Sequence, residues 1–386
     1  MYDFDKIIRR ESTANYKYDL RDRFFGKDDV IPLWVADMDF ETPVFIREAI
    51  LKRVKHPIYG YSFREESYYK SIVEWVQNRH NWTIDADWIV YSPGVVPALN
   101  LSTVQFTNEG DSIIVQPPVY FPFFSAVTDN KRVQLSNQLI LKNGRYYIDF
   151  EDFEQKAQKA KMCFLSSPHN PVGRVWTKEE LLRLGEICVR NNVIIISDEV
   201  HNDLILPGIK HIPLASLSPE ISDITVTCIA PSKTFNLAGL STSSVIISNK
   251  DLKDKFEDIL NRFHLSFGNL FGAIASEAGY TFGAQWVDEL NEYINANYKE
   301  VEQALKRSGS NIKLIVPEAT YLAWLDFRDT GYNDDQIKDI LINSARLGLS
   351  HGPSFGDGGQ GFQRMNLAAP RSIIKEAMGR LIKAFK

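Results

Sequence analysis

The stretch TVTCIAPSKTFN, residues 225–236, joins a short apolar run to a polar turn that carries a lysine. Runs of this length that are apolar on both faces are typical of buried strands in a mostly parallel sheet. Similar runs, separated by helical or connecting stretches, occur at Ser112–Gln116, Met162–Ser166, Val193–Ser197 and Ser244–Ser248. The alternation predicts an α/β fold whose large domain has three layers, with helices on both sides of a mostly parallel sheet.

The two ends of the chain differ from this α/β region in their pattern of apolar and polar residues, and this pattern predicts a smaller α+β domain. We expect residues 1–45 to join that small domain, residues 46–285 to form the large domain, and residues 286–386 to complete the small one. Thr177 and Glu180 have the spacing of a capping box, which predicts a helix over Thr177–Asn191. The other expected elements are helices at Pro43–Lys55, Glu65–His80, Asp334–Leu347 and Arg371–Ala384, a helical region over Asp251–Lys306, and strands at Lys313–Val316 and Tyr321–Phe327.

Composition excludes several classes of partner. The 386 residues carry 44 basic and 49 acidic side chains, a net charge of −5, so the chain lacks the basic surface that nucleic acid requires. No apolar run approaches the roughly 18 residues of a membrane helix, so we expect no membrane partner and a cytoplasmic location. The three cysteines, Cys163, Cys188 and Cys228, are scattered, which predicts neither a disulfide framework nor a metal site.

The segment GDGGQG, residues 356–361, has the spacing of a dinucleotide-binding fingerprint. That fingerprint requires a preceding strand and a following helix. Residues 362–367 alternate like a strand instead, so the segment is interpreted as a loop.

Short polar motifs follow the apolar runs, where open α/β sheets bind their ligands. Taken alone each is weak, since Asn-Pro is usually a turn and a lysine after serine is usually solvated. In this order, from residues 34–40 to residues 361–366, they resemble the fold-type I pyridoxal-phosphate enzymes of the class I/II aminotransferase family. The motifs are SPGVVPA (92–98), PPVY (117–120), SSPHNPVG (166–173), SDEVH (197–201) and SKTFN (232–236).

The resemblance implies that pyridoxal 5'-phosphate is bound by Lys233 through an imine. A lysine that forms such a bond must present a neutral amine, which burial favours. The resemblance places Asp198 against the ring nitrogen, because the ring withdraws electrons only while that nitrogen is protonated. The two residues are 35 positions apart, enough for one crossover and a strand.

The cofactor phosphate needs N–H donors at the start of a helix. The resemblance assigns this role to Gly94, Val95 and Val96, with the Ser232 hydroxyl as a further donor. In the aspartate aminotransferase pattern an arginine also holds the phosphate, but this chain has Ser241 at that position. Backbone donors must therefore carry more of the phosphate binding.

Four further residues complete the implied cofactor site. Tyr120 matches the aromatic residue that stacks on the ring, and Asn170 matches the donor to the phenolic oxygen. His201 stands where the aspartate aminotransferase pattern has a tyrosine, and it is a candidate near the cofactor or a satisfied core histidine. Tyr61 matches a residue that reaches the phosphate of the neighbouring subunit, which implies a homodimer.

One branch of the family fits best. Residues 34–40, 59–61, 198–201 and 321–326 resemble the cystathionine β-lyase/C–S lyase, cystalysin-like, branch. This likeness implies α,β-elimination of cystathionine or a related sulfur amino acid to thiol, pyruvate and ammonia, with Lys233, Asp198 and Tyr120 as catalytic residues. It places the substrate on Arg364 and Asn170, and a structural ion pair is the alternative role for Arg364. Transamination with a 2-oxo acid, or a regulatory protein whose cofactor is mainly structural, are the alternative functions.

Overall fold

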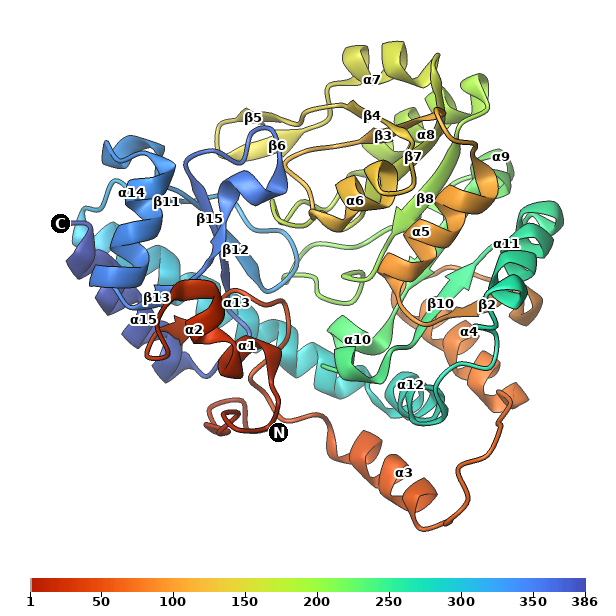
Figure 1. Cartoon of the computed structure of the whole chain (residues 1–386), viewed down its shortest axis with the longest axis horizontal. Helices are drawn as coiled ribbons and strands as arrows, with labels where there is room; N and C mark the ends of the chain where they lie inside the picture. Colours follow the sequence, from red (N-terminus) through yellow and green to blue (C-terminus); the bar gives the residue numbers. More distant parts are fainter. Residues whose placement is uncertain (1) are drawn as a thin grey trace.

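A seven-stranded sheet forms the centre of the computed structural model, which describes residues 2–386 (Figure 1). Its strand order is β2-β10-β9-β8-β7-β3-β4, and the five strands from β9 to β4 are parallel. Strand β10 is antiparallel to both of its neighbours. The prediction of a mostly parallel sheet is therefore confirmed. The strands are β2 (Ile89–Ser92), β3 (Ser112–Val115), β4 (Val133–Ser136), β7 (Ala160–Ser166), β8 (Ile194–Asp198), β9 (Thr225–Ile229) and β10 (Ser243–Ile246).

Helices cover both faces of this sheet and bury two apolar clusters against it. On one face lie α5 (Val95–Phe106), α6 (Pro122–Thr128) and α11 (Lys250–Arg262). On the other lie α7 (Phe150–Ala157), α8 (Lys178–Asn191) and α9 (Pro219–Asp223). The predicted capping box of α8 is present, because Thr177 Oγ1 accepts from the Glu180 N–H at 3.2 Å and Glu180 Oε2 accepts from the Thr177 N–H at 2.8 Å.

A smaller antiparallel sheet has the order β11-β12-β15-β14. Its strands are β11 (Lys313–Leu314), β12 (Leu322–Asp326), β14 (Ser350–His351) and β15 (Phe362–Asn366), with α13 (Ala284–Ser308) and α15 (Arg371–Ala384) nearby. The N-terminal strand β1 (Ile31–Pro32) pairs with β13 (Leu347–Gly348), so the start of the chain lies against its C-terminal part. The short helices α1 (Tyr16–Asp19) and α2 (Arg21–Phe25) lie in the same region of Figure 1.

The remaining elements follow the sequence closely, with two corrections. A single helix was expected over Asp334–Leu347, but α14 spans only Asp334–Asp339 and passes into a π-helical turn, Ile340–Ser344. The helical run does not reach Leu347, because Arg346 has a positive φ of 54° and Leu347 pairs with Ile31 in β13. The expected strand Lys313–Val316 is shorter, as β11. The other elements are α3 (Val44–Val54), α4 (Glu66–His80), α10 (Pro231–Thr234), α12 (Leu270–Phe282) and the hairpin β5 (Ile140–Lys142) and β6 (Arg145–Tyr147).

Two properties of the described chain bear on its chemistry. No helix within residues 2–386 has both the length and the apolar character to span a bilayer. Over the same residues, no three His, Cys, Asp or Glu side chains gather in a way that would hold a metal ion. The loop at residues 356–361 leads directly into β15, as the alternating sequence predicts.

Candidate active site

The ends of four strands bring the sequence motifs to one edge of the large sheet. Ser166 of β7 pairs with Asp198 of β8, which pairs with Cys228 of β9. Because β10 is antiparallel, its first residues start at this same edge. A cavity of about 200 Å³ opens there, and it is lined by every predicted cofactor-binding residue except Tyr61: Gly94, Val95, Val96, Tyr120, Asn170, Asp198, His201, Ser232 and Lys233.

Lys233 lies in α10, the single helical turn that follows β9, and its side chain faces the cavity. Its Nζ donates a hydrogen bond to the carbonyl oxygen of Ala36 at 2.6 Å. Burial lowers the pKa of Lys233 to about 8, helped by the nearby Arg364 guanidinium and opposed by Asp37 and Asp198. A neutral amine is therefore accessible near physiological pH, as a nucleophilic lysine requires.

Asp198 ends β8, and it is only 6% exposed. Its Oδ1 accepts one hydrogen bond, from the Val200 N–H at 3.1 Å, and within residues 2–386 it forms no salt bridge. Burial raises the pKa of Asp198 to about 7, although the Val200 N–H and Lys233 act in the opposite direction. A buried carboxylate without a cationic partner suits a ligand that brings its own positive charge, such as a protonated ring nitrogen.

The opposite end of the cavity is suited to an anion. Helix α5 begins after Gly94 without a side-chain cap, so the N–H groups of its first turn are directed to the cavity region and its dipole favours negative charge. The hydroxyl-bearing residues Ser232, Ser241 and Thr242 line the same cavity, and Thr242 Oγ1 is buried without a hydrogen-bond partner. Sequence reasoning missed Thr242, because nothing in the sequence indicated that β10 runs antiparallel and starts at this edge.

Three side chains lie between these two ends. Tyr120 lines the cavity from the loop after β3. His201 is buried, and desolvation together with Lys233 and Arg364 holds its pKa well below the usual range, so the ring is neutral. Its Nδ1 has no hydrogen-bond partner within residues 2–386. Asn170 Oδ1 accepts a hydrogen bond from Arg364 Nη1 at 3.0 Å.

Arg364 extends from β15 of the small sheet to the same cavity edge. Its Nη2 donates to the Trp34 carbonyl at 2.8 Å and to Ser350 Oγ at 3.1 Å, and its guanidinium lies 5.0 Å from the centre of the Phe355 ring. No carboxylate of residues 2–386 forms a salt bridge with it. Burial lowers the pKa of Arg364 to about 10. A buried guanidinium without an anionic partner is suited to binding a carboxylate from a ligand.

A second cavity, of about 560 Å³, continues from Lys233, Tyr120 and Arg364. Its wall is largely aromatic and aliphatic and contains no aspartate or glutamate. No local pattern predicts this cavity, because its lining residues come from segments that lie far apart in the chain. Its aromatic lining residues are Tyr16, Phe24, Phe25, Trp34, Tyr120 and Phe121.

The structure does not bring Tyr61 to this site. Its side chain is 94% exposed, and its ring lies 5.3 Å from that of Phe267, on the outer surface.

The chain belongs to the aminotransferase class I and II family, whose model matches residues 28–381. This confirms the predicted family. Within it, the chain is 42% identical over 380 residues to cystathionine beta-lyase PatB of Bacillus subtilis, with 98% of each chain covered. It is 30% identical over 390 residues to protein MalY of Escherichia coli, covering 100% of this chain and 99% of MalY. Cystalysin from Treponema denticola, solved with pyridoxal 5'-phosphate, superposes with a TM-score of 0.96 at 37% identity, covering 100% of this chain and 98% of that one.

The protein is thus a pyridoxal-phosphate-dependent enzyme, and its cavity fits that cofactor. The unpaired buried carboxylate of Asp198 matches the ring nitrogen, and the start of α5 with the orphaned Thr242 hydroxyl matches the phosphate. Lys233 stands between these two ends of one cavity. The particular branch is the one that contains cystathionine β-lyases and C–S lyases, as the sequence predicted.

Proposed function

We propose that the enzyme cleaves the carbon–sulfur bond of cystathionine or a related sulfur amino acid by α,β-elimination. The sulfur leaves as a thiol, and one water hydrolyses the released unsaturated amine to pyruvate and ammonia. The observation that carries this proposal is the unpaired guanidinium of Arg364, which shares one cavity wall with Lys233 and opens onto the apolar chamber. An amino acid held by its carboxylate at Arg364 has room for a sulfur substituent in that chamber. The identity to a protein named cystathionine beta-lyase supports the same assignment.

Each residue has a distinct role in this reaction. When bound, the cofactor withdraws electrons from Cα of the substrate, which makes the Cα proton removable. The amine of Lys233, once free, takes that proton as the general base. Arg364 orients the substrate carboxylate by a planar pair of donors, and Asp198 supplies the negative charge that keeps the ring nitrogen protonated. The electron pair left at Cα then expels the sulfur at Cβ as a thiolate.

We also propose that the active unit is a cytoplasmic homodimer. Tyr59, Tyr61, Phe63 and Phe267 form an exposed aromatic surface, which is unusual for a protein that remains a monomer. Among residues 2–386, those that line the phosphate end include no cation, so we propose that a hydroxyl from a second subunit completes it. Tyr61 of the neighbouring subunit is our candidate for that contact.

The reaction is tested by supplying cystathionine to the purified holoenzyme, with and without a 2-oxo acid. We expect pyruvate and ammonia in equal amounts without the oxo acid. Lys233→Ala is the matched control, because it retains the substrate cavity without the base. A strict requirement for the oxo acid would show the enzyme to be an aminotransferase instead. Absence of any turnover, with partner proteins retained from lysate, would favour a regulatory protein.

A further inference from the structure

Residues 34–40, which we call the strap, form neither helix nor strand. Their backbone is instead fixed by hydrogen bonds from side chains of other segments. Each of the five carbonyl groups from Trp34 to Met38 accepts a hydrogen bond from a side chain of another segment. The donors and distances are Arg364 Nη2 and Ser350 Oγ to Trp34 O (both 2.8 Å), Asn366 Nδ2 to Val35 O (2.7 Å), Lys233 Nζ and Tyr321 Oη to Ala36 O (2.6 and 3.0 Å), Asn366 Nδ2 and Lys17 Nζ to Asp37 O (2.6 and 3.5 Å), and Arg10 Nη1 and Asn236 Nδ2 to Met38 O (both 3.0 Å).

Two of these donors belong to the active site. Lys233 uses the Ala36 carbonyl, and Arg364 uses the Trp34 carbonyl two residues earlier. Lys233 comes from the large sheet region, and Arg364 comes from β15 of the small sheet. The spacing between the base and the carboxylate-binding group therefore depends on the conformation of the strap.

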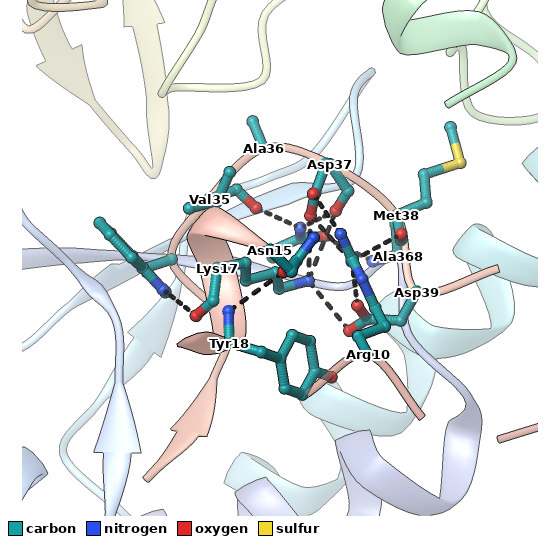
Figure 2. Close-up of polar contacts among 12 residues, drawn as sticks. Arg10, Asn15, Lys17, Tyr18, Val35, Ala36, Asp37, Met38, Asp39 and Ala368 are labelled. Atoms are coloured by element: carbon teal, nitrogen blue, oxygen red, sulfur yellow. Dashed lines mark hydrogen bonds and ion pairs between the residues drawn. The ribbon is translucent and has the colours of Figure 1, made fainter. Parts of the chain in front are cut away.

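Two carboxylates of the strap, Asp37 and Asp39, form a cluster of four charged residues with Arg10 and Lys17 (Figure 2). Arg10 bridges the two carboxylates, with Nη2 2.6 Å from Asp37 Oδ2 and Nη1 2.5 Å from Asp39 Oδ1. Lys17 Nζ lies 2.9 Å from Asp39 Oδ2 and 3.5 Å from Asp37 Oδ1. We call these four residues the charge cluster. Its two positive and two negative charges sum to zero.

Lys17 is the most unusual member, because its side chain is 0% exposed. Burying a lysine with its carboxylate partner costs desolvation energy, and an apolar pair often stabilises a fold as well or better. Lys17 also accepts a hydrogen bond at its carbonyl from Trp34 Nε1 at 3.1 Å, so it contacts both ends of the strap. The cluster therefore specifies the conformation of the strap more than it adds stability.

We propose that Arg10, Lys17, Asp37 and Asp39 are positioning residues for catalysis, which fix the strap so that its carbonyls hold Lys233 and Arg364 in register. This proposal rests on the proposed function for its reaction. The Ala36 carbonyl holds the Lys233 amine within the site whenever that amine is free. The Trp34 carbonyl and the Ser350 hydroxyl hold Arg364 Nη2, whereas Arg364 Nε has no hydrogen-bond partner among residues 2–386.

The cluster also sets the electrostatic surroundings of Lys233. Charged groups that face its Nζ are Asp37 on the strap, Asp198 on β8 and Arg364 on β15, and His201, Tyr120 and Tyr321 line the neighbouring walls. Removing one cation from the neutral cluster leaves a net negative charge beside Lys233, which favours a protonated nitrogen. Removing one carboxylate has the opposite effect.

The test compares the holoenzyme variants Lys17→Met and Asp37→Asn with a structural control, Arg132→Met. Arg132 binds Thr107 by hydrogen bonds from Nε and Nη2 of 2.9 and 2.5 Å, and it lines neither site cavity. Four quantities are measured: kcat, KM, the affinity for cofactor, and the pH midpoint of the absorbance of the lysine-bound cofactor.

We expect both cluster variants to lower kcat and raise KM, each by about 10-fold, because both Lys233 and Arg364 lose their register. The pH midpoint should rise by about half a unit in Lys17→Met and fall by a similar amount in Asp37→Asn. Cofactor affinity should change less than kcat and KM, because Ala36 is the strap residue that lines the cofactor cavity and most of its wall comes from the ends of the large sheet. Arg132→Met should lower only the melting temperature.

Cluster variants that lose thermal stability but keep the kcat, KM and pH midpoint of the parent would overturn the proposal. Should Lys17→Met fail to fold, Asp37→Asn carries the test, because Asp37 is partly exposed and its amide retains the size of the carboxylate. The absorbance midpoint does not depend on which reaction follows. A failure of the proposed C–S lyase activity is therefore distinguishable from a failure of this proposal.

Discussion

Two regions of the molecule bury carboxylates in opposite ways. At the end of β8, Asp198 has no cationic partner in the described chain, and burial raises its pKa to about 7. In the charge cluster, Asp37 binds both Arg10 and Lys17, which hold its pKa below the usual range against the opposing effect of burial. The first carboxylate is left for a ligand, and the second is satisfied by the protein.

The difference separates a binding site from its support. A buried carboxylate without a partner lowers the stability of the ligand-free protein. Such a group is therefore expected at a site where it binds a ligand. A fully paired cluster needs no ligand and instead fixes nearby backbone. Arg364 belongs with Asp198 in this respect, because its guanidinium is buried without a carboxylate. The following predictions test the two classes in order of expected effect.

The largest effect is expected at Lys233, which lines both cavities. Lys233→Ala should lower turnover by at least about 10³-fold, because it removes the covalent link and the general base. Borohydride reduction of the parent holoenzyme followed by peptide mapping should place the cofactor label on Lys233. Label on a different lysine would contradict the assignment of Lys233 as the cofactor-binding lysine.

Arg364→Ala should give a substrate defect with an intact cofactor site. We expect kcat/KM to fall by about 30- to 1000-fold, since the loss of a charge-assisted bidentate contact costs roughly 2–4 kcal/mol. Cofactor absorbance should not change. Arg364→Lys should recover only part of the activity, because an ammonium lacks the planar fork. Parent-like cleavage of cystathionine by Arg364→Ala would instead make Arg364 a structural residue.

Asp39→Asn should destabilise the fold, because Lys17 then remains buried with a weaker partner. Lys17 and Asp39 are 0% and 5% exposed, so the expected loss of unfolding free energy is about 2 kcal/mol. Chemical denaturation at neutral pH measures it. An unchanged denaturation midpoint would mean that the ion pair between Lys17 and Asp39 does not stabilise the fold.

The sequence predicted the large sheet and the residues at its carboxyl ends, because local apolar runs and short motifs carry that information. Lys233, Asp198 and Asn170 follow strands, so their meeting follows from the sheet itself. The charge cluster could not be predicted, since Arg10 and Lys17 lie 20 or more residues from the carboxylates that they bind and belong to no motif.

Other features also depended on long-range contacts. The helical run that begins with α14 stops before Leu347, which pairs with Ile31, and no local pattern indicates that pairing. The place of Tyr61 in a subunit interface, and the division of the chain near residues 45 and 285, stay predictions.

Asp198 is interpreted as a carboxylate without a cationic partner in the protein, available to a charged ligand. The free energy of unfolding, measured as a function of pH, tests this interpretation. The pKa of Asp198 is about 7 in the folded protein and about 3.9 in the unfolded chain. The contribution of Asp198 to the free energy of unfolding therefore decreases as pH rises between these two values. In the cofactor-free protein at pH 8, Asp198→Asn should therefore increase the unfolding free energy by at least about 1 kcal/mol, while weakening cofactor binding. A variant that is less stable than the parent at pH 8 would contradict the account.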